Sequence, residues 1–196
     1  MRALEPLSAN PEPRLAALQA DSAHAGFRMA SEPHLWELIR GLAASKPGRL
    51  AVETGAGTGL ATFWILQGLS PDGRLISVES HECFQDIARK HLGYDTRLDL
   101  RLGATMDAIR DIPKGSVGMF FADAEPGKYE DLDFVLGLLE PGGIYIVDDI
   151  YVRPHWPNDF VIRPAQLLKS LYARGDGFVT VLEYGVGMAL FTKSAN

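Results

Sequence analysis

Ala51-Val-Glu-Thr-Gly-Ala-Gly-Thr-Gly59 is the stretch of sequence that decides the fold. Apolar residues lead into an acid, glycines then recur at 55, 57 and 59, and an apolar segment follows. Glycine lets the backbone turn tightly and approach a ligand without a Cβ in the way. A helix that begins after the glycines offers free N–H groups to that ligand. The stretch therefore predicts a strand, a ligand-binding loop and a helix.

Outward from this loop, segments typical of strands and of helices alternate along the chain. Strands are expected at residues 49–54, 74–79, 96–102, 117–123 and 144–149. Helices are expected at residues 58–69, 82–92, 105–112, 129–139 and 165–174, with a turn at 141–143. This alternation indicates βαβ units and a parallel sheet of class α/β. Two further strands, 178–184 and 188–193, flank Gly185-Val-Gly187 and predict a terminal β-hairpin.

Residues 1–48 differ in pattern and predict a helical segment ahead of the core at 49–196. Residues 11–23 suit a short helix, and a second helix has Leu35 and Ile39 at helical spacing, with Ser31 as its N-cap. Pro47-Gly48 ends that helix. With 196 residues and no long linker, a single domain over 1–196 is expected.

Charge and composition exclude several classes of function. The chain has a formal net charge of −6, without a long basic cluster, so neither a nucleic acid nor an anionic membrane is expected as a partner. No segment has the pattern of a signal peptide or of a membrane span. A single cysteine, Cys83, allows no internal disulfide, suits a cytoplasmic location and is expected to pack inside its helix. The oligomeric state is open, and a homodimer is one option.

Two cofactor classes compete for the glycine loop. A dinucleotide loop of the form G-x-G-x-x-G would place its third glycine at Leu60, one position later than here. The pattern E-x-G-x-G-x-G, beginning at Glu53, instead resembles motif I of the class I methyltransferases that use S-adenosylmethionine (SAM). Glu79, at the end of the second strand, suits the two ribose hydroxyls of either cofactor. A glycine-rich turn without a ligand is the remaining alternative.

Three acids follow buried strands at the predicted carboxyl edge of the sheet. They are Asp123 after the fourth strand, and Asp148 and Asp149 after the fifth. Ligands of open α/β sheets bind beyond this edge, and clustered carboxylates need a cation or a proton between them. Carboxylate oxygens suit Mg²⁺, Mn²⁺ or Ca²⁺, so a divalent metal site is predicted. The alternative is that Asp148 or Asp149 only closes the loop into Tyr151.

Three longer segments carry a more specific resemblance. Leu102-Gly-Ala-Thr-Met-Asp-Ala-Ile-Arg-Asp-Ile112, Phe120-Phe-Ala-Asp-Ala-Glu-Pro-Gly-Lys-Tyr129 and Leu139-Glu-Pro-Gly-Gly-Ile-Tyr-Ile-Val-Asp-Asp149 are similar to the catechol and caffeoyl-CoA O-methyltransferase group. With the glycine loop, the similarity runs from Arg49 to Asp149. It implies a Rossmann-like, mostly parallel seven-stranded sheet with helices on both faces, SAM as methyl donor, and a divalent metal.

The same resemblance implies a set of site residues. Asp123, Asp148 and Asp149 would bind the metal. The residues implied for the cofactor are Glu53, Gly55, Ala56, Gly57, Thr58, Gly59, Glu79, Ser80, Ala104, Thr105, Met106 and Asp123.

This chain departs from the group's pattern in three places. Asp149 stands where the group has Asn, and a third carboxylate disfavours an anionic acceptor. Pro126 stands where the group has its catalytic lysine, so Lys128, two residues on, is the substitute candidate, and a merely solvated lysine is the alternative. Met106 replaces a glutamine, which removes one hydrogen bond to adenine.

The loop at 150–159 is expected to overhang the reacting methyl group. Trp156 and Tyr151 could stack on an aromatic acceptor, and His155 is a candidate general base; packing for stability is the alternative. The catalytic candidates are thus Asp123, Lys128 and His155. The expected function is SAM-dependent O-methylation of a small molecule. An NAD-dependent oxidoreductase, disfavoured by the missing Tyr-x-x-x-Lys pair, and a non-catalytic SAM-binding protein are the alternatives.

Overall fold

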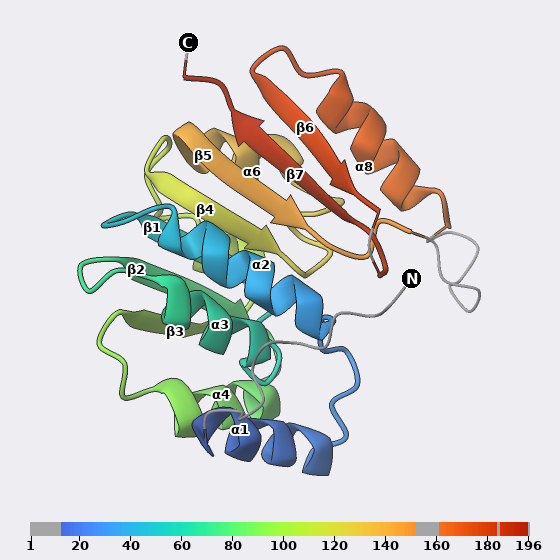
Figure 1. The fold of residues 1–196 in the computed structure, drawn as a ribbon. Helices are drawn as coiled ribbons and strands as arrows, with labels where there is room; N and C mark the ends of the chain where they lie inside the picture. Colours follow the sequence, from blue (N-terminus) through green and yellow to red (C-terminus); the bar gives the residue numbers. More distant parts are fainter. Residues whose placement is uncertain (1–12, 152–160, 184, 196) are drawn as a thin grey trace, which may run out of the picture.

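A seven-stranded sheet forms the centre of the molecule (Figure 1). The computed structural model describes residues 13–151, 161–183 and 185–195. The strand order is β3-β2-β1-β4-β5-β7-β6. The strands are β1 (Leu50–Thr54), β2 (Arg74–Glu79), β3 (Leu98–Leu102), β4 (Val117–Ala122), β5 (Leu139–Val147), β6 (Gly177–Leu182) and β7 (Met188–Lys193). Strands β1 to β5 pair in parallel, and the hairpin β6–β7 joins β5 in the antiparallel sense, which confirms the predicted fold class.

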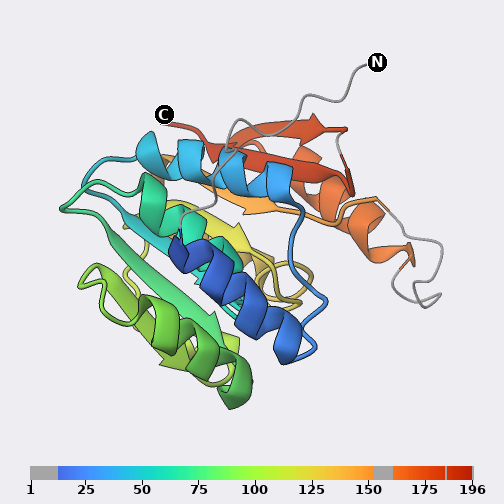
Figure 2. The same ribbon diagram turned by 60° about the horizontal axis from the view of Figure 1, so that its bottom comes forward.

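Helices cover both faces of the sheet (Figures 1 and 2). They are α1 (Pro13–His24), α2 (Pro33–Ala44), α3 (Leu60–Gly68), α4 (Glu82–Leu92), α5 (Thr105–Ala108), α6 (Leu132–Leu138) and α8 (Arg163–Tyr172). Successive residues of a strand face opposite sides, so Met119 and Phe121 of β4 join a core with α1, α2 and α3, whereas Phe120 joins a second core with α6 and α8. Both cores thus hold the carboxyl ends of the strands in fixed positions.

The helix expected at 105–112 ends at Ala108, and the expectations for the segment 141–143 and for the N-cap of α2 are wrong. The segment 141–143 is part of β5, where it displaces the pairing, so that Val117 pairs with Leu139 but Met119 pairs with Ile144. A register shift of this kind is a β-bulge, which absorbs the extra residues without ending the strand. The N-cap of α2 is Glu32 rather than Ser31, whose side chain is used elsewhere.

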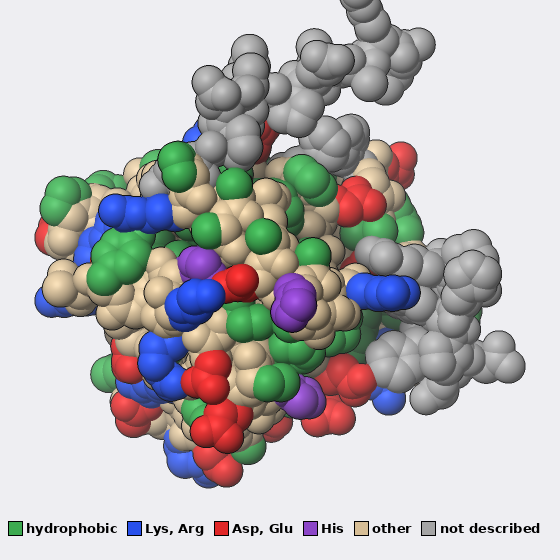
Figure 3. Space-filling view, turned by 90° about the horizontal axis from the view of Figure 1, so that it is seen from below, with side chains coloured by type: hydrophobic (Ala, Val, Ile, Leu, Met, Phe, Trp, Pro, Cys, Tyr) green, Lys and Arg blue, Asp and Glu red, His purple; other side chains and the backbone are tan. Residues whose placement is uncertain are grey.

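The amino-terminal helices pack on the rest of the chain. Leu18 and Ile39 are fully buried in the same core as the sheet. Lys90 of α4 forms an ion pair with Asp21 of α1, and His91 lies within hydrogen-bond distance of the same carboxylate. Figure 3 views the molecule from below, the side on which α1 and α4 lie in Figure 1, and acidic, basic and histidine side chains are interspersed there. Among the described helices, none combines the length and the apolar character that crossing a membrane requires.

Candidate functional site

The glycine loop needs glycine for two separate reasons. Gly55, Gly57 and Gly59 have φ angles of +83°, +54° and +92°, a region that side chains strongly disfavour. A Cβ on Gly55 would lie only 2.5 Å from the carbonyl oxygen of Asp123. The N–H groups of Gly55 and Ala56 both donate to the carbonyl of Val78, at 3.0 Å. The loop is therefore held between the ends of β2 and β4.

The amino-terminal segment covers the outer side of this loop. A Cβ on Gly57 would lie 2.4 Å from the ring of Phe27, and that ring meets Phe84 edge-on with centroids 5.0 Å apart. The Ser22 hydroxyl donates to the buried Thr58 hydroxyl at 2.8 Å. The Thr58 side chain thus faces α1, which leaves its backbone as the part available to a cofactor.

Glu79 lies beside the glycine loop, as the sequence predicts for a ribose-binding acid. Its Oε2 accepts a hydrogen bond from the Gly57 N–H at 2.7 Å, and its Oε1 accepts from the N–H groups of Ser80 and His81, each at 2.8 Å. The Gly103 N–H donates to the Glu79 carbonyl at 3.0 Å. That bond brings the adenine candidates, at 104–106, to the same edge of the sheet as the loop.

Glu53 is a fully buried acid at the end of β1. Its Oε2 accepts hydrogen bonds from the hydroxyls of Thr62 and Ser77, both at 2.6 Å, while no described residue donates to its Oε1. Burial raises the pKa of Glu53 from an ordinary 4.5 to about 7, and the two hydroxyls limit the rise. Glu53 is thus a protonatable group in the interior beneath the loop.

The raised pKa of Glu53 predicts a stability that falls with rising pH. The folded state holds the proton more tightly than the unfolded state, so stability is full below about pH 4.5 and is lost as the pH rises through about 7. A shift of this size is worth about 3 kcal/mol. In urea unfolding at about pH 5 and about pH 8, Glu53→Gln should show a smaller pH dependence than the unmodified protein. An unchanged pH dependence would contradict the assignment, and exposed Glu37→Gln is the control.

Three carboxylates meet at the ends of β4 and β5. Asp123, Asp148 and Asp149 each place one carboxylate oxygen within 4.8 Å of the others. Burial and the neighbouring Asp148 carboxylate raise the pKa of Asp123 well above its usual value, and burial also raises the pKa of Asp148. The Ser31 hydroxyl donates to Asp123 Oδ2 at 3.3 Å. The predicted acids are therefore brought together, with a hydroxyl that the sequence did not indicate.

Lys128 is buried beside these acids. Its side chain is 7% exposed, and its Nζ lies 3.7 Å from Asp148 Oδ1. The loop that carries it is fixed by the Tyr145 hydroxyl, which donates to the carbonyl of Gly127 at 2.9 Å. The alternative of a solvated lysine is therefore wrong. Pro126 precedes this turn and carries no ionisable group.

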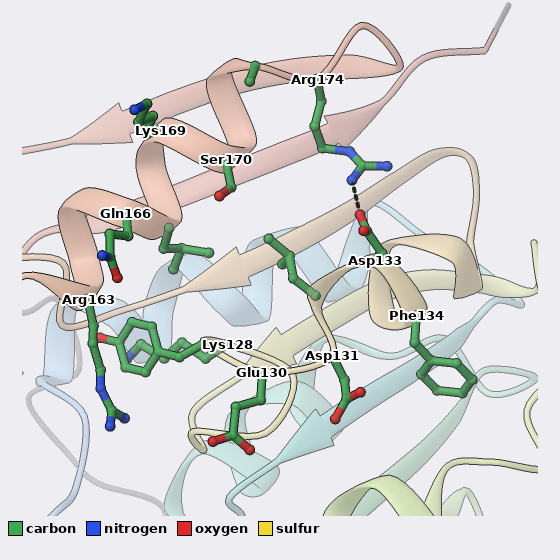
Figure 4. Close-up of a pocket in the computed structure, with 14 residues that line it drawn as sticks. Lys128, Glu130, Asp131, Asp133, Phe134, Arg163, Gln166, Lys169, Ser170 and Arg174 are labelled. Carbon is green, nitrogen blue, oxygen red and sulfur yellow. Dashed lines mark hydrogen bonds and ion pairs between the residues drawn. The ribbon is translucent and has the colours of Figure 1, made fainter.

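Two cavities adjoin the Lys128–Asp148 pair, one lined by each of these residues. The larger, of about 1040 Å³, lies between the segment at 128–134 and α8, and Figure 4 shows charged side chains of both signs around it, with the Arg174–Asp133 ion pair across one end. The smaller, of about 200 Å³, contains Asp148 itself. Its other lining residues are Glu32, Leu35, Leu38, Leu182, Val186, Gly187 and Met188. The larger cavity is thus bordered by Lys128 and the smaller, largely apolar one by Asp148.

The family follows from comparison with known proteins. A family model described as a methyltransferase domain matches residues 52–150, a range that contains the glycine loop and the three carboxylates. The chain belongs to the methyltransferase family. It is 26% identical over 144 residues to the catechol O-methyltransferase of Mycobacterium tuberculosis, a match that covers 71% of this chain and 66% of that one. The chain spans just under two thirds of the length of the curated relatives that head the comparison.

Solved methyltransferase structures share the fold of this one. The O-methyltransferase TomG from Streptomyces achromogenes, in complex with SAM, superposes with a TM-score of 0.83 at 22% identity and covers 96% of this chain and 92% of its own. The O-methyltransferase from Bacillus cereus, in complex with S-adenosylhomocysteine (SAH), gives 0.84 at 21% identity, with 96% and 94% covered. These likenesses extend beyond residues 52–150 to the terminal hairpin and the amino-terminal helices.

The residues at the site of this methyltransferase fit both SAM and a divalent cation. Asp148 Oδ1 is buried and has no hydrogen-bond donor among the described residues. Such an atom next to two further carboxylates suits a hard cation. The left-handed glycines allow close approach to the loop, and the Glu79 carboxylate at its side suits the hydroxyls of a ribose.

Some residues of the methyltransferase lie in other surroundings than the sequence predicts, and others are not among the described residues. His155 and Trp156 lie outside the described residues, so their roles stay predictions. Tyr151 donates its N–H to the Val186 carbonyl at 2.9 Å, and its ring packs on Gly187, beside the small cavity. Cys83 is exposed, contrary to the expected packing inside its helix.

Proposed function

We propose that this methyltransferase transfers the methyl group of SAM to an oxygen atom of a small molecule, with a divalent cation at the three carboxylates. One observation carries the proposal: Asp123 belongs to both halves of the site. Its carbonyl lies directly against Gly55 of the loop, and its carboxylate belongs to the acid cluster. A methyl donor in the loop and an acceptor at the acids would therefore be adjacent, as transfer requires.

The cofactor half of the proposal assigns a role to each segment around the loop. SAM, when bound, supplies an electrophilic methyl group. Glu79 would accept hydrogen bonds from its ribose, with Ser80 at the adjoining turn, while the loop at 55–59 and Glu53 would lie near its methionine end. The segment at 104–106 would lie near adenine, and Asp123 near the amino group. The Oε1 atom of Glu53 and the glycine φ angles support this arrangement.

The acceptor half of the proposal concerns charge. A divalent cation, when bound, lowers the pKa of an acceptor hydroxyl and orients it. Asp123, Asp148 and Asp149 would hold it, and Lys128 offsets part of their negative charge from the buried side. Among the described residues, Lys128 and Asp123 are the proposed catalytic groups. The role of His155 stays a prediction. The catechol O-methyltransferase from Mycobacterium tuberculosis supports an O-methyl transfer of this kind.

A thermal-shift experiment with three ligands tests the cofactor. SAM and SAH are each expected to stabilise the protein, by about 2.7 kcal/mol at a hundredfold excess over Kd, which raises Tm by about 5–10 °C. NAD is expected to leave Tm unchanged, because the third glycine is one position too early for a dinucleotide loop. Stabilisation by NAD but by neither SAM nor SAH would overturn the proposal in favour of an oxidoreductase.

The remaining predictions concern partners and place. The acceptor is proposed to be a small molecule, because the cavity that contains Asp148 has a volume of about 200 Å³. Its aromatic character, a homodimer and a cytoplasmic location stay predictions. Methyl transfer from SAM to any acceptor separates the enzyme from a non-catalytic SAM-binding protein of the same fold.

A further inference from the structure

The small cavity at Asp148 has a distinct chemical character. Aliphatic side chains line it from α2 and from the terminal hairpin, namely Leu35, Leu38, Leu182, Val186 and Met188. Its charged lining residues are both acids, Glu32 and Asp148. The cavity is therefore an apolar space with negative charge, and its carboxylate Asp148 also belongs to the acid cluster.

The volume of the small cavity limits what enters it. An apolar cavity of about 150 Å³ accommodates benzene, whereas pockets for drug-sized ligands measure about 300–1,000 Å³. At about 200 Å³, the cavity holds one six-membered ring, or an aliphatic body of that size, with a short substituent. A molecule seated there places a hydroxyl group at Asp148 and its apolar body among the leucines.

Glu32 is a half-buried acid at the small cavity. It is the N-cap residue of α2, yet its side chain makes no capping hydrogen bond. No hydrogen bond or ion pair of its carboxylate is found among the described residues, and its Oε2 lies so close to Gly185 that a Cβ there would be 2.0 Å away. A carboxylate at an apolar cavity attracts a cation, because Coulomb attraction grows as water is excluded.

The two cavities differ in the charges that they present. Side chains of both charges line the large cavity, and Arg163 and Lys169 from α8 are among its basic residues. Among the described residues, no basic side chain lines the small cavity, and Lys128, which is near Asp148, lines the large one. An acceptor whose body occupies the small cavity therefore meets carboxylates at both Glu32 and Asp148.

We propose that Glu32 is a specificity-determining residue, which selects acceptors that carry an ammonium group on a small apolar body and rejects acceptors that carry a carboxylate. This inference rests on the proposed function, because it takes the hydroxyl at the acid cluster to be the methyl acceptor. Glu32 selects through its charge and takes no part in the transfer itself.

Three probes with one ring and different charge test the selection: tyramine, para-ethylphenol and para-hydroxyphenylacetate. Calorimetric titration of the protein saturated with SAH and Mg²⁺ should show tyramine binding about tenfold more tightly than para-ethylphenol, and para-hydroxyphenylacetate binding most weakly. Glu32→Gln should lower the ratio of tyramine affinity to para-ethylphenol affinity about tenfold. Glu32→Lys should reverse the order of affinity of the two charged probes. Glu37→Gln, on the exposed side of the same helix, is the matched control and should leave the order unchanged.

The outcomes separate this inference from the proposed function. Equal binding of the three probes, binding of none of them, or an unchanged preference in a folded Glu32→Gln protein would each overturn the role of Glu32. Absence of SAH binding would overturn the proposed function instead. In that case, the relative affinities of the three probes for the protein without SAH still decide the role of Glu32. The Tm of each variant establishes that it is folded.

Discussion

Gly55→Ala is expected to abolish SAM and SAH binding and to destabilise the fold. The added Cβ would lie 2.5 Å from the Asp123 carbonyl oxygen and 2.7 Å from its carbonyl carbon, and backbone atoms cannot rotate away. The φ of +83° adds strain of about 1 kcal/mol for any side chain. Relief requires the loop and the end of β4 to separate, which displaces the cofactor loop from the acids. A loss of at least about a hundredfold in SAH affinity is expected, measured by calorimetry.

Gly115→Ala is the matched control for this variant. Gly115 has a φ of +71°, and a Cβ there meets no atom within 4 Å. Its replacement therefore imposes similar backbone strain without a steric clash, in a turn before β4. Gly115→Ala should lower stability by about 1 kcal/mol and leave SAH affinity unchanged. If Gly55→Ala bound SAH as tightly as Gly115→Ala does, the placement of the loop against Asp123 would be incorrect.

Asp148→Ala is expected to abolish divalent cation binding. The unmodified protein should titrate with Mn²⁺ or Mg²⁺ to one site in calorimetry, and the variant should show none, because Asp148 contributes the buried oxygen of the cluster. Since a bound cation lowers the barrier by several kcal/mol, kcat/KM should fall by at least about a hundredfold. SAH affinity should change much less, because the loop and Glu79 remain intact.

Asp99→Ala provides the comparison for Asp148→Ala. Asp99 lies on β3 with a side chain that is 54% exposed and paired with Arg101, away from the acid cluster. Its replacement should leave both cation binding and kcat/KM unchanged. Cation titration that persists in Asp148→Ala would refute the metal site. If methyl transfer continues in EDTA, the cation has no role in catalysis. The same result would still support SAM as the cofactor.

Local sequence signals were sufficient to predict the sheet and its acids. Largely apolar runs that begin directly after a glycine placed β2 and β7 at the observed residues. The residues that follow parallel strands all lie at the carboxyl edge of the sheet. The proximity of Asp123 and Asp148 could therefore be predicted without knowing how the side chains pack. Burial of Lys128 could not be predicted in this way, because it depends on the turn that Tyr145 fixes from the next strand.

The segment between α1 and α2 contributes site residues whose individual contacts no motif predicts. Phe27, Ser31 and Glu32 lie within six positions of one another, and none carries a motif. They reach the loop, the acid cluster and the small cavity only because the helices on either side of them pack on the sheet. The sequence shows that a hydroxyl and an acid follow an aromatic residue in this segment. It does not show which distant residues these side chains contact.

The chain order of the site has a consequence for folding during synthesis. Ser31 meets Asp123 across 92 positions, and the small cavity joins Glu32 to residues 182–188. Contacts so distant in sequence form late, because the intervening chain must first lose its freedom. A nascent chain that ends before the β6–β7 hairpin has its glycine loop and its acids but lacks one wall of the acceptor cavity. Selectivity for the acceptor is therefore the last property of the site that the emerging chain acquires.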